Sequence, residues 1–174
     1  MKFDLTRATE ILRQTPYTLA RMLDGLSPEW TESKNDREHW SPYDVVGHLI
    51  HGEETDWIPR AEIILQHGVN RPFDPYDRLA QFEKSKGRSL ADLLTEFAHA
   101  RNTSLEKLGR FELTPEQFTL KGMHPKLGEV TLEQLLAAWV VHDLNHIRQI
   151  VEFMAAQYID EVGPWKQYLS ILNK

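Results

Sequence analysis

Hydrophobic residues recur at helical spacing in four long segments of the chain, over about residues 4–23, 41–68, 89–109 and 131–158. No run rich in Val, Ile and Thr alternates with polar residues between turns, as a strand would. Each segment has one hydrophobic face, and four such helices bury these faces by packing together. The pattern therefore predicts an all-α protein with a four-helix bundle. A turn at 163–165 then leads into a short C-terminal helix.

Local signals mark where these helices begin and where they are interrupted. Ser41 stands before a proline, and Ser89 and Thr131 each have a capping partner three residues later. Both patterns are typical of a helix N-terminus. Pro16 and Pro59 fall inside the first two segments, where proline removes a helical donor. We expect a kink or a restart at Pro16 and a bend at Pro59.

Composition indicates one ordinary soluble domain. Its 174 residues are enough for one domain over 1–174. The absence of cysteine excludes disulfides, thiolate metal ligands and a cysteine nucleophile. A net charge of −6 without a basic run argues against nucleic-acid and membrane-surface partners. Because the sequence has neither an apolar leader nor a span long enough to cross a membrane, we expect a cytoplasmic protein.

The most apolar segment carries three polar residues on its hydrophobic face. His142, Asp143 and His146 fall in the same half of the helix as its large apolar residues. His142 and His146 are four residues apart, so that both imidazoles can reach one divalent ion. Two core histidines satisfied by hydrogen bonds would give the same pattern. Both interpretations stay open on the spacing alone.

The other histidines give weaker signals. His48 lies on the flank of the hydrophobic face of the second segment, and His51 points away from that face. A single Glu96-x-x-His99 motif faces away from the third hydrophobic face, whereas di-iron bundles need two such motifs. The remaining histidines fall in predicted loops or helix ends and are expected at the surface: His39, His67 and His124.

Charged residues also intrude on hydrophobic faces. Arg101 lies within the apolar arc of the third segment, and Glu53 and Asp56 lie on that of the second. The guanidinium fork suits a carboxylate, so Arg101 paired with Asp143 or Glu53 would satisfy both charges in a dry interior. The alternative is that Arg101 extends to solvent at the end of the bundle.

Other catalytic classes fit less well. Residues 142–146 resemble the zincin motif with Asp143 in place of glutamate, but aspartate reaches less far toward a metal. The HD phosphohydrolases also join a His-Asp pair to a separate histidine, although about ninety residues between His48 and His142 fit their compact layout poorly. No phosphate-binding glycine loop and no Gly-x-Ser-x-Gly elbow is present. Covalent catalysis therefore has no evident nucleophile in the chain.

Two signatures together resemble the DinB-like superfamily. They are residues 40–49 (WSPYDVVGHL) and 139–147 (WVVHDLNHI), with a His-Pro pair at 124–125 and Gly-Pro-Trp at 163–165. The resemblance implies a bundle of up-down-down-up topology and a divalent metal held by three histidines. These correspond to His48, His142 and His146. Characterised relatives include transferases and isomerases that depend on bacillithiol or mycothiol, which implies a low-molecular-weight thiol as a partner.

The functional expectation is a metal-dependent enzyme that transfers a thiol to a small molecule or hydrolyses it. Three neutral imidazoles leave coordination positions open and do not select among Zn²⁺, Ni²⁺, Fe²⁺ and Mn²⁺. Asp143 and Glu53 are the candidate catalytic residues, to orient a ligand's second nitrogen or to carry a proton. The alternative is a non-catalytic metal-binding bundle that forms a homodimer in a stress response.

Overall fold

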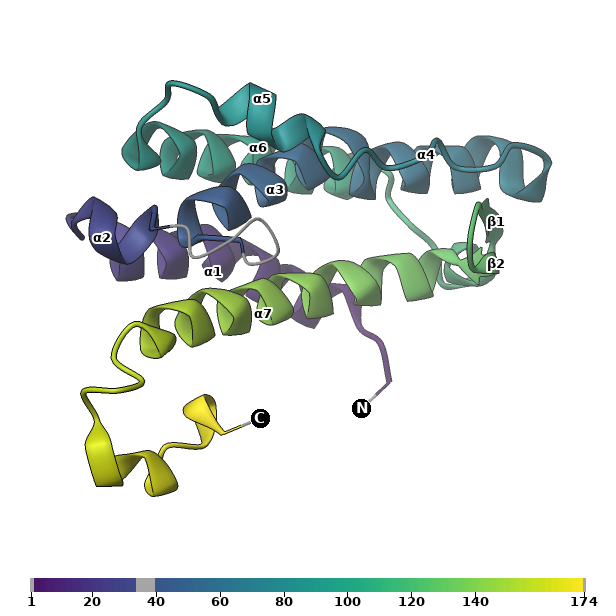
Figure 1. The fold of residues 1–174 in the computed structure, drawn as a ribbon. Coiled ribbons are helices and arrows are strands. Elements are labelled where there is room, and N and C mark those ends of the chain that lie inside the picture. The colour runs from purple at the N-terminus through teal and green to yellow at the C-terminus, as the bar shows by residue number, and fades with distance from the viewer. Residues whose placement is uncertain (1, 34–39, 174) are drawn as a thin grey trace.

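The computed structural model describes residues 2–33 and 40–173. Four helical segments form a bundle, as the sequence predicts (Figure 1). They are α1 (Leu5–Leu23), α3 (Pro42–Thr55) continued by α4 (Trp57–His67), α6 (Leu90–Arg110) and α7 (Leu132–Ala156). The short helices α2 (Pro28–Thr31) and α5 (Ala80–Ser85) lie in the connections. No helix among these residues combines the length and the apolar composition needed to cross a membrane.

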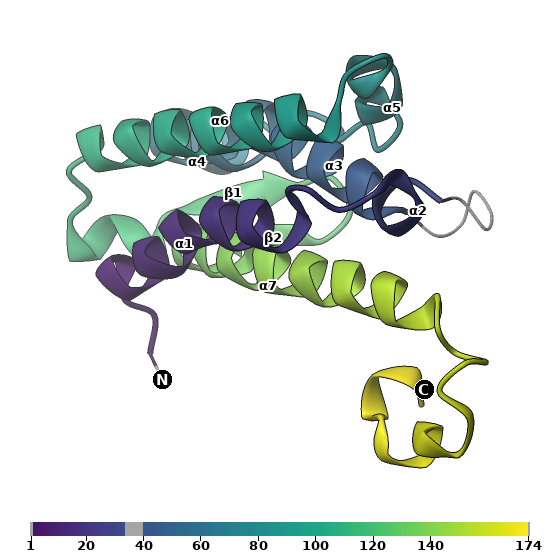
Figure 2. The ribbon, with the colours of Figure 1, turned by 90° about the vertical axis from the view of Figure 1, so that its left-hand side faces the viewer.

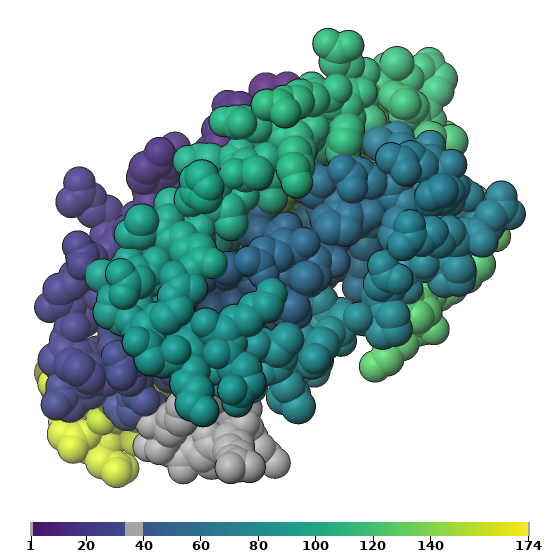
Figure 3. Space-filling model, turned by 90° about the horizontal axis from the view of Figure 1, so that it is seen from above, coloured from purple at the N-terminus to yellow at the C-terminus, as the bar shows by residue number. Residues whose placement is uncertain are grey.

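The bundle has the up-down-down-up order. Helices α1 and α7 run in one direction, and α3–α4 and α6 run in the other (Figures 1 and 2). Two successive parallel helices need a connection as long as the bundle, and residues 68–89, which include α5, supply it. In the space-filling view from above, the atoms of α3 and α4 form a band beside those of α6 (Figure 3).

A β-hairpin that the sequence pattern did not predict joins α6 to α7. Strand β1 (Lys121–His124) pairs antiparallel with β2 (Gly128–Thr131). Each strand is too short for an alternating pattern to be recognised. The hairpin is fixed by packing: a Cβ at Gly122 would lie within 2.6–2.8 Å of side-chain atoms of Ile64 and Phe73. The Phe73 N–H also donates to the Met123 carbonyl at 2.9 Å.

The two prolines act differently. Helix α1 continues through Pro16, so the helix does not restart there. Proline leaves the carbonyl four residues earlier, that of Leu12, without its helical donor. Arg101 Nη1 donates to this oxygen at 2.7 Å and replaces the lost bond. The second segment is instead interrupted at Asp56, three residues before Pro59, where α3 ends at Thr55 and α4 begins at Trp57.

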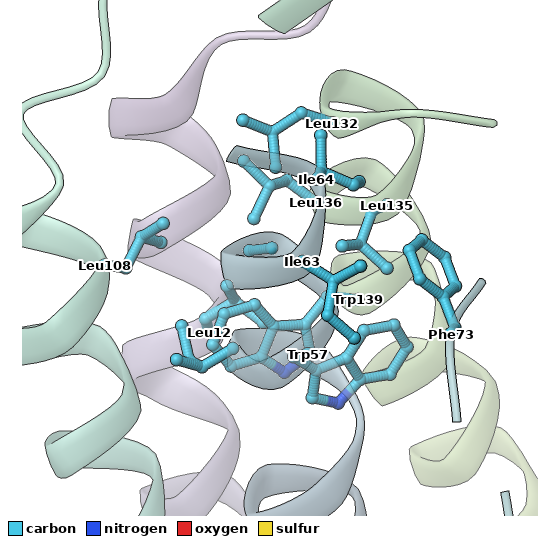
Figure 4. Packing of buried hydrophobic residues seen from close by; sticks show 12 residues of the cluster. Leu12, Trp57, Ile63, Ile64, Phe73, Leu108, Leu132, Leu135, Leu136 and Trp139 are labelled. Atoms are coloured by element: carbon cyan, nitrogen blue, oxygen red, sulfur yellow. The ribbon is translucent and has the colours of Figure 1, made fainter. Parts of the chain in front are cut away.

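The core consists of two hydrophobic clusters separated by a buried polar layer. One cluster contains Leu12, Trp57, Leu108 and Trp139 (Figure 4), together with further residues near the α4 end of the bundle. The other occupies the opposite halves of the same helices and contains Leu19, Val45, Val46, Leu49, Leu93, Phe97 and Ile150. The polar layer consists of Glu53, Arg101 and Asp143, and each of these residues falls between the two clusters along its own helical segment. Asp143 directly follows the predicted ligand His142.

The chain leaves the bundle after α7. The short C-terminal helix expected after residue 163 takes the form of two 3₁₀ helices, Gly163–Tyr168 and Ser170–Leu172 (yellow in Figure 1).

Candidate metal centre

The three predicted ligands meet at one point in the bundle. His48 comes from α3, and His142 and His146 lie one turn apart on α7. The Nε2 atoms of His48 and His146 are each 3.1 Å from Nε2 of His142. All three ligand nitrogens lie within 4.8 Å of one another.

These distances fit a shared divalent ion. Nitrogen ligands about 2.0–2.1 Å from a metal lie about 2.9–3.4 Å apart at right-angle or tetrahedral geometry. The two 3.1 Å separations fall in that range. Without a cation, three neutral imidazoles that face one another with Nε2 would bring together lone pairs that have too few N–H donors to pair with. A metal cation accepts all three lone pairs. The donor set therefore fits a metal such as Zn²⁺, Ni²⁺, Fe²⁺ or Mn²⁺.

The environment keeps these imidazoles neutral. Burial, assisted by the neighbouring His146, lowers the pKa of His48 to about 3. Burial and the adjacent histidines lower the pKa of His142 to about 2. The pKa of His146 is lowered by burial as well. A histidine binds a metal only in its deprotonated form, so the lowered pKa values favour coordination.

Neighbouring side chains contact the second nitrogen, Nδ1, of two of the three rings. His48 Nδ1 lies 2.9 Å from the Tyr76 hydroxyl, and His146 Nδ1 lies 2.8 Å from Gln149 Oε1. An amide oxygen accepts a hydrogen bond, so Nδ1 of His146 carries the proton and Nε2 keeps its lone pair for a metal. Nδ1 of His142 is buried without a hydrogen-bond partner among the described residues.

A cavity of about 480 Å³ borders the three histidines. Its other lining residues come from the segment before α3, the junction of α3 and α4, α4, α7, the hairpin and the connection between α4 and α6. They are Trp40, Asp56, Arg60, Tyr76, Arg78, His124, Asn145 and Gln149. A small molecule in this space would therefore face a bound metal directly.

The buried polar layer centres on Arg101, which is fully buried. Its Nη1 and Nη2 donate to the two carboxylate oxygens of Asp143 at 2.6 and 2.9 Å, and its Nε donates to Glu53 Oε1 at 2.9 Å. Trp139 Nε1 donates to the same Glu53 oxygen at 3.0 Å. The predicted pairing is confirmed with both partners, and the alternative of a solvent-exposed Arg101 is wrong. Burial raises the pKa of Glu53, although the guanidinium opposes this effect.

The structure does not bring the two candidate catalytic acids to the cavity. Asp143 and Glu53 do not line it, and both are bonded to Arg101. The described carboxylate that does line the cavity is Asp56, whose Oδ1 pairs with Arg60 Nε at 2.5 Å. Burial raises the pKa of Asp56 to about 6. A direct role of Asp143 or Glu53 in proton transfer stays a prediction.

The remaining histidines fall into four groups. His99 and His67 are exposed, as expected, and His39 lies outside the described residues. His51 is only 5% exposed, because the connection after α4 covers it, with the Tyr76 ring centroid 5.0 Å away. Its burial therefore comes from the connection, and the expectation that it points away from the hydrophobic face stays a prediction. His124 lines the cavity because the unpredicted hairpin carries it there.

Sequence reasoning missed several residues of the site. Gln149 stands three residues after His146 on the same helix face, a spacing that could have identified it. Tyr76 and Arg78 lie in an irregular connection, where periodicity gives no signal.

Comparison with known proteins agrees with this architecture. The family model of the DinB superfamily matches residues 11–150. The chain belongs to the DinB superfamily. Among solved structures, this DinB chain resembles YfiT from Bacillus subtilis with a TM-score of 0.73 and 23% sequence identity, over 87% of this chain and 86% of that one. YfiT is described as a probable metal-dependent hydrolase with an unusual four-helix bundle topology. No curated protein matches the chain significantly.

Proposed function

We propose that this DinB protein is a divalent-metal-dependent enzyme that acts on a small molecule, as a hydrolase or as a thiol-dependent transferase. The observation that carries the proposal is the convergence of three neutral imidazole nitrogens beside a cavity of about 480 Å³. The description of YfiT as a probable metal-dependent hydrolase supports the hydrolytic alternative.

His48, His142 and His146 would hold the metal through Nε2. Such an ion lowers the pKa of a coordinated water or thiol toward neutrality and so supplies a nucleophile. Because the three ligands are neutral, they leave the full positive charge of the ion to stabilise an anion.

The attacking group comes from outside the chain in this proposal. The sequence has no cysteine, and no serine or threonine is among the described residues that line the cavity. Water and a low-molecular-weight thiol are the two nucleophiles that such a site can use. The choice between them separates a hydrolase from a transferase.

The protein's own residues support the reaction in two ways. Tyr76 and Gln149 hold the rings of His48 and His146, and the bonds to Arg101 fix Asp143 on the helix turn between the two α7 ligands. We assign Asp143 and Glu53 this positioning role. Asp56 on the cavity wall has a pKa of about 6, so its carboxyl group can exchange a proton near neutral pH.

The test compares metal-free protein, metal-restored protein and a His142→Ala variant treated in the same way. Each preparation is assayed with simple esters and amides, and with thiol-reactive electrophiles in the presence of added thiols. We expect activity only in the metal-restored wild type, on at least one class of substrate. Equal rates in the three preparations across the whole panel would remove the enzymatic proposal.

A non-catalytic, metal-binding dimer is the second candidate. Large hydrophobic side chains are exposed on α7 and in the C-terminal segment, among them Val141, Trp165 and Tyr168. Such residues favour self-association. A metal-loaded protein that sediments as a dimer and is inactive on every substrate would support this candidate.

A further inference from the structure

The cavity beside the histidines carries an excess of positive charge, although the whole chain has a net charge of −6. Arg60 and Asp56 both line it and pair with each other at 2.5 Å, so their charges balance. Arg78 lines it too and makes no ion pair with a carboxylate among the described residues. Its charge therefore remains available to a ligand.

Trp40 places Arg78 close to the histidines. The guanidinium carbon of Arg78 lies 5.6 Å from the centroid of the Trp40 ring. The same indole lies 4.9 Å from the His48 ring and parallel to the His146 ring, at an interplanar angle of 9°. A contact with the ring face holds the guanidinium without using its N–H donors on a carboxylate.

Nearby acids are engaged elsewhere. Asp77 Oδ1 accepts the backbone N–H groups of Leu79 and Ala80 at 2.9 and 3.3 Å. Asp74 pairs with Arg71, at 3.3 Å, on the exposed side of the connection. Neither acid lines the cavity.

We propose that the ligand of this cavity carries a carboxylate or similar oxyanion, which Arg78 binds while the reacting group of the same molecule faces the three histidines. This inference rests on the proposed function, because it concerns the substrate or co-substrate of the same site. A planar fork of N–H donors recognises an oxyanion by two parallel hydrogen bonds.

The geometry limits the size of that ligand. The Trp40 ring centroid lies 5.6 Å from the guanidinium carbon of Arg78 and 4.9 Å from the centroid of the His48 ring. The guanidinium carbon is therefore at most about 10.5 Å from the centre of the His48 ring. This distance is short enough for one small molecule to carry both the oxyanion and the reacting atom.

The test uses three thiols that differ in charge at the end remote from sulfur: mercaptopropionate, mercaptoethanol and mercaptoethylamine. Each is titrated into the cobalt-substituted protein, and the thiolate-to-cobalt absorption band reports binding. We expect wild type to bind the carboxylate at least about tenfold more tightly than the neutral thiol, because a charge-assisted hydrogen bond is lost with the latter. Arg78→Gln should abolish this preference, and Arg78→Glu should favour the amine.

Arg71→Gln is the matched control, because it removes the same charge from the same connection at an exposed residue that does not line the cavity. It should keep the wild-type preference. Equal affinities for the charged and neutral thiols in wild type, or a preference that persists in Arg78→Gln, would overturn the inference and leave the metal-dependent function standing.

A second set of titrations separates the two proposals. Glutarate and its neutral diamide carry no thiol, and tryptophan fluorescence of the metal-loaded protein follows their binding. If no thiol binds, the thiol-dependent function fails, while a preference for glutarate that Arg78→Gln removes still supports the oxyanion site. If no thiol binds and glutarate shows no preference that depends on Arg78, the inference is overturned as well.

Discussion

At the scale of single residues, burial gives the histidines the protonation state that a metal requires. Spacing alone indicated that His142 and His146 share a face, but their environment could not be inferred without the surrounding elements. Burial is the largest cause of the lowered pKa values of His48 and His142, which fall to about 3 and about 2. Tyr76 comes from a distant connection, and its bond to His48 depends on the folded chain.

The lowered pKa values predict how the stability of the metal-free protein depends on pH. Below about pH 6.5 the unfolded chain binds protons at histidines that stay neutral in the folded state, so stability falls as pH decreases. At pH 5 each such histidine lowers the free energy of unfolding by about 2 kcal/mol relative to its value at neutral pH. We expect His142→Gln to reduce this loss between pH 6.5 and 5, as measured by urea unfolding of the metal-free protein.

His99→Gln provides the comparison, because His99 is exposed. This variant should follow the wild-type dependence on pH. Parallel stability curves for wild type and His142→Gln would show that His142 titrates normally in the folded protein.

At the scale of elements, the sequence predicted the helices well wherever the helical pattern of hydrophobic residues extended over many residues. The helix bounds of α1, α6 and α7 lie within about two residues of those predicted, because many periodic positions and N-terminal caps define them. The hairpin could not be predicted, because it is defined by the close packing of Gly122 against α4. No local sequence pattern indicates it. Likewise, the continuity of α1 through Pro16 depends on a hydrogen bond from Arg101 on another helix.

Arg101 consequently joins four helices, and its removal tests the buried polar layer. Arg101→Met leaves Asp143 and Glu53 without their cation and the Leu12 carbonyl without its donor. Breaking a buried pair on one side typically costs about 3–5 kcal/mol. We expect a loss of that size in the free energy of unfolding.

Arg110→Met on the same helix is a suitable control, since Arg110 is exposed and lies 3.8 Å from Glu106 at the surface. Its effect should remain within about 0.5 kcal/mol. A similar effect of the two substitutions would contradict the structural importance of the buried layer.

At the scale of the whole molecule, the topology creates the site. The long connection through α5 makes α3–α4 and α6 parallel, and it carries Tyr76 and Arg78 to the cavity (Figure 1). The bundle could be predicted from helical periodicity. The clustering of His142 and His146 could be predicted from their spacing, whereas His48 was added to them by the DinB resemblance. Half of the other lining residues of the cavity could not be predicted, because they lie outside helices and strands, where periodicity gives no signal: Trp40, Asp56, Tyr76 and Arg78.

The central claim is that His48, His142 and His146 together bind one divalent ion. The most direct measurement is elemental analysis of the purified protein after loading and removal of excess metal, for wild type and for the triple alanine variant. We predict about one transition-metal ion per chain in wild type, as expected for a single three-histidine site, and none in the variant. An equal metal content in the two proteins, with the variant folded by circular dichroism, would contradict the assignment.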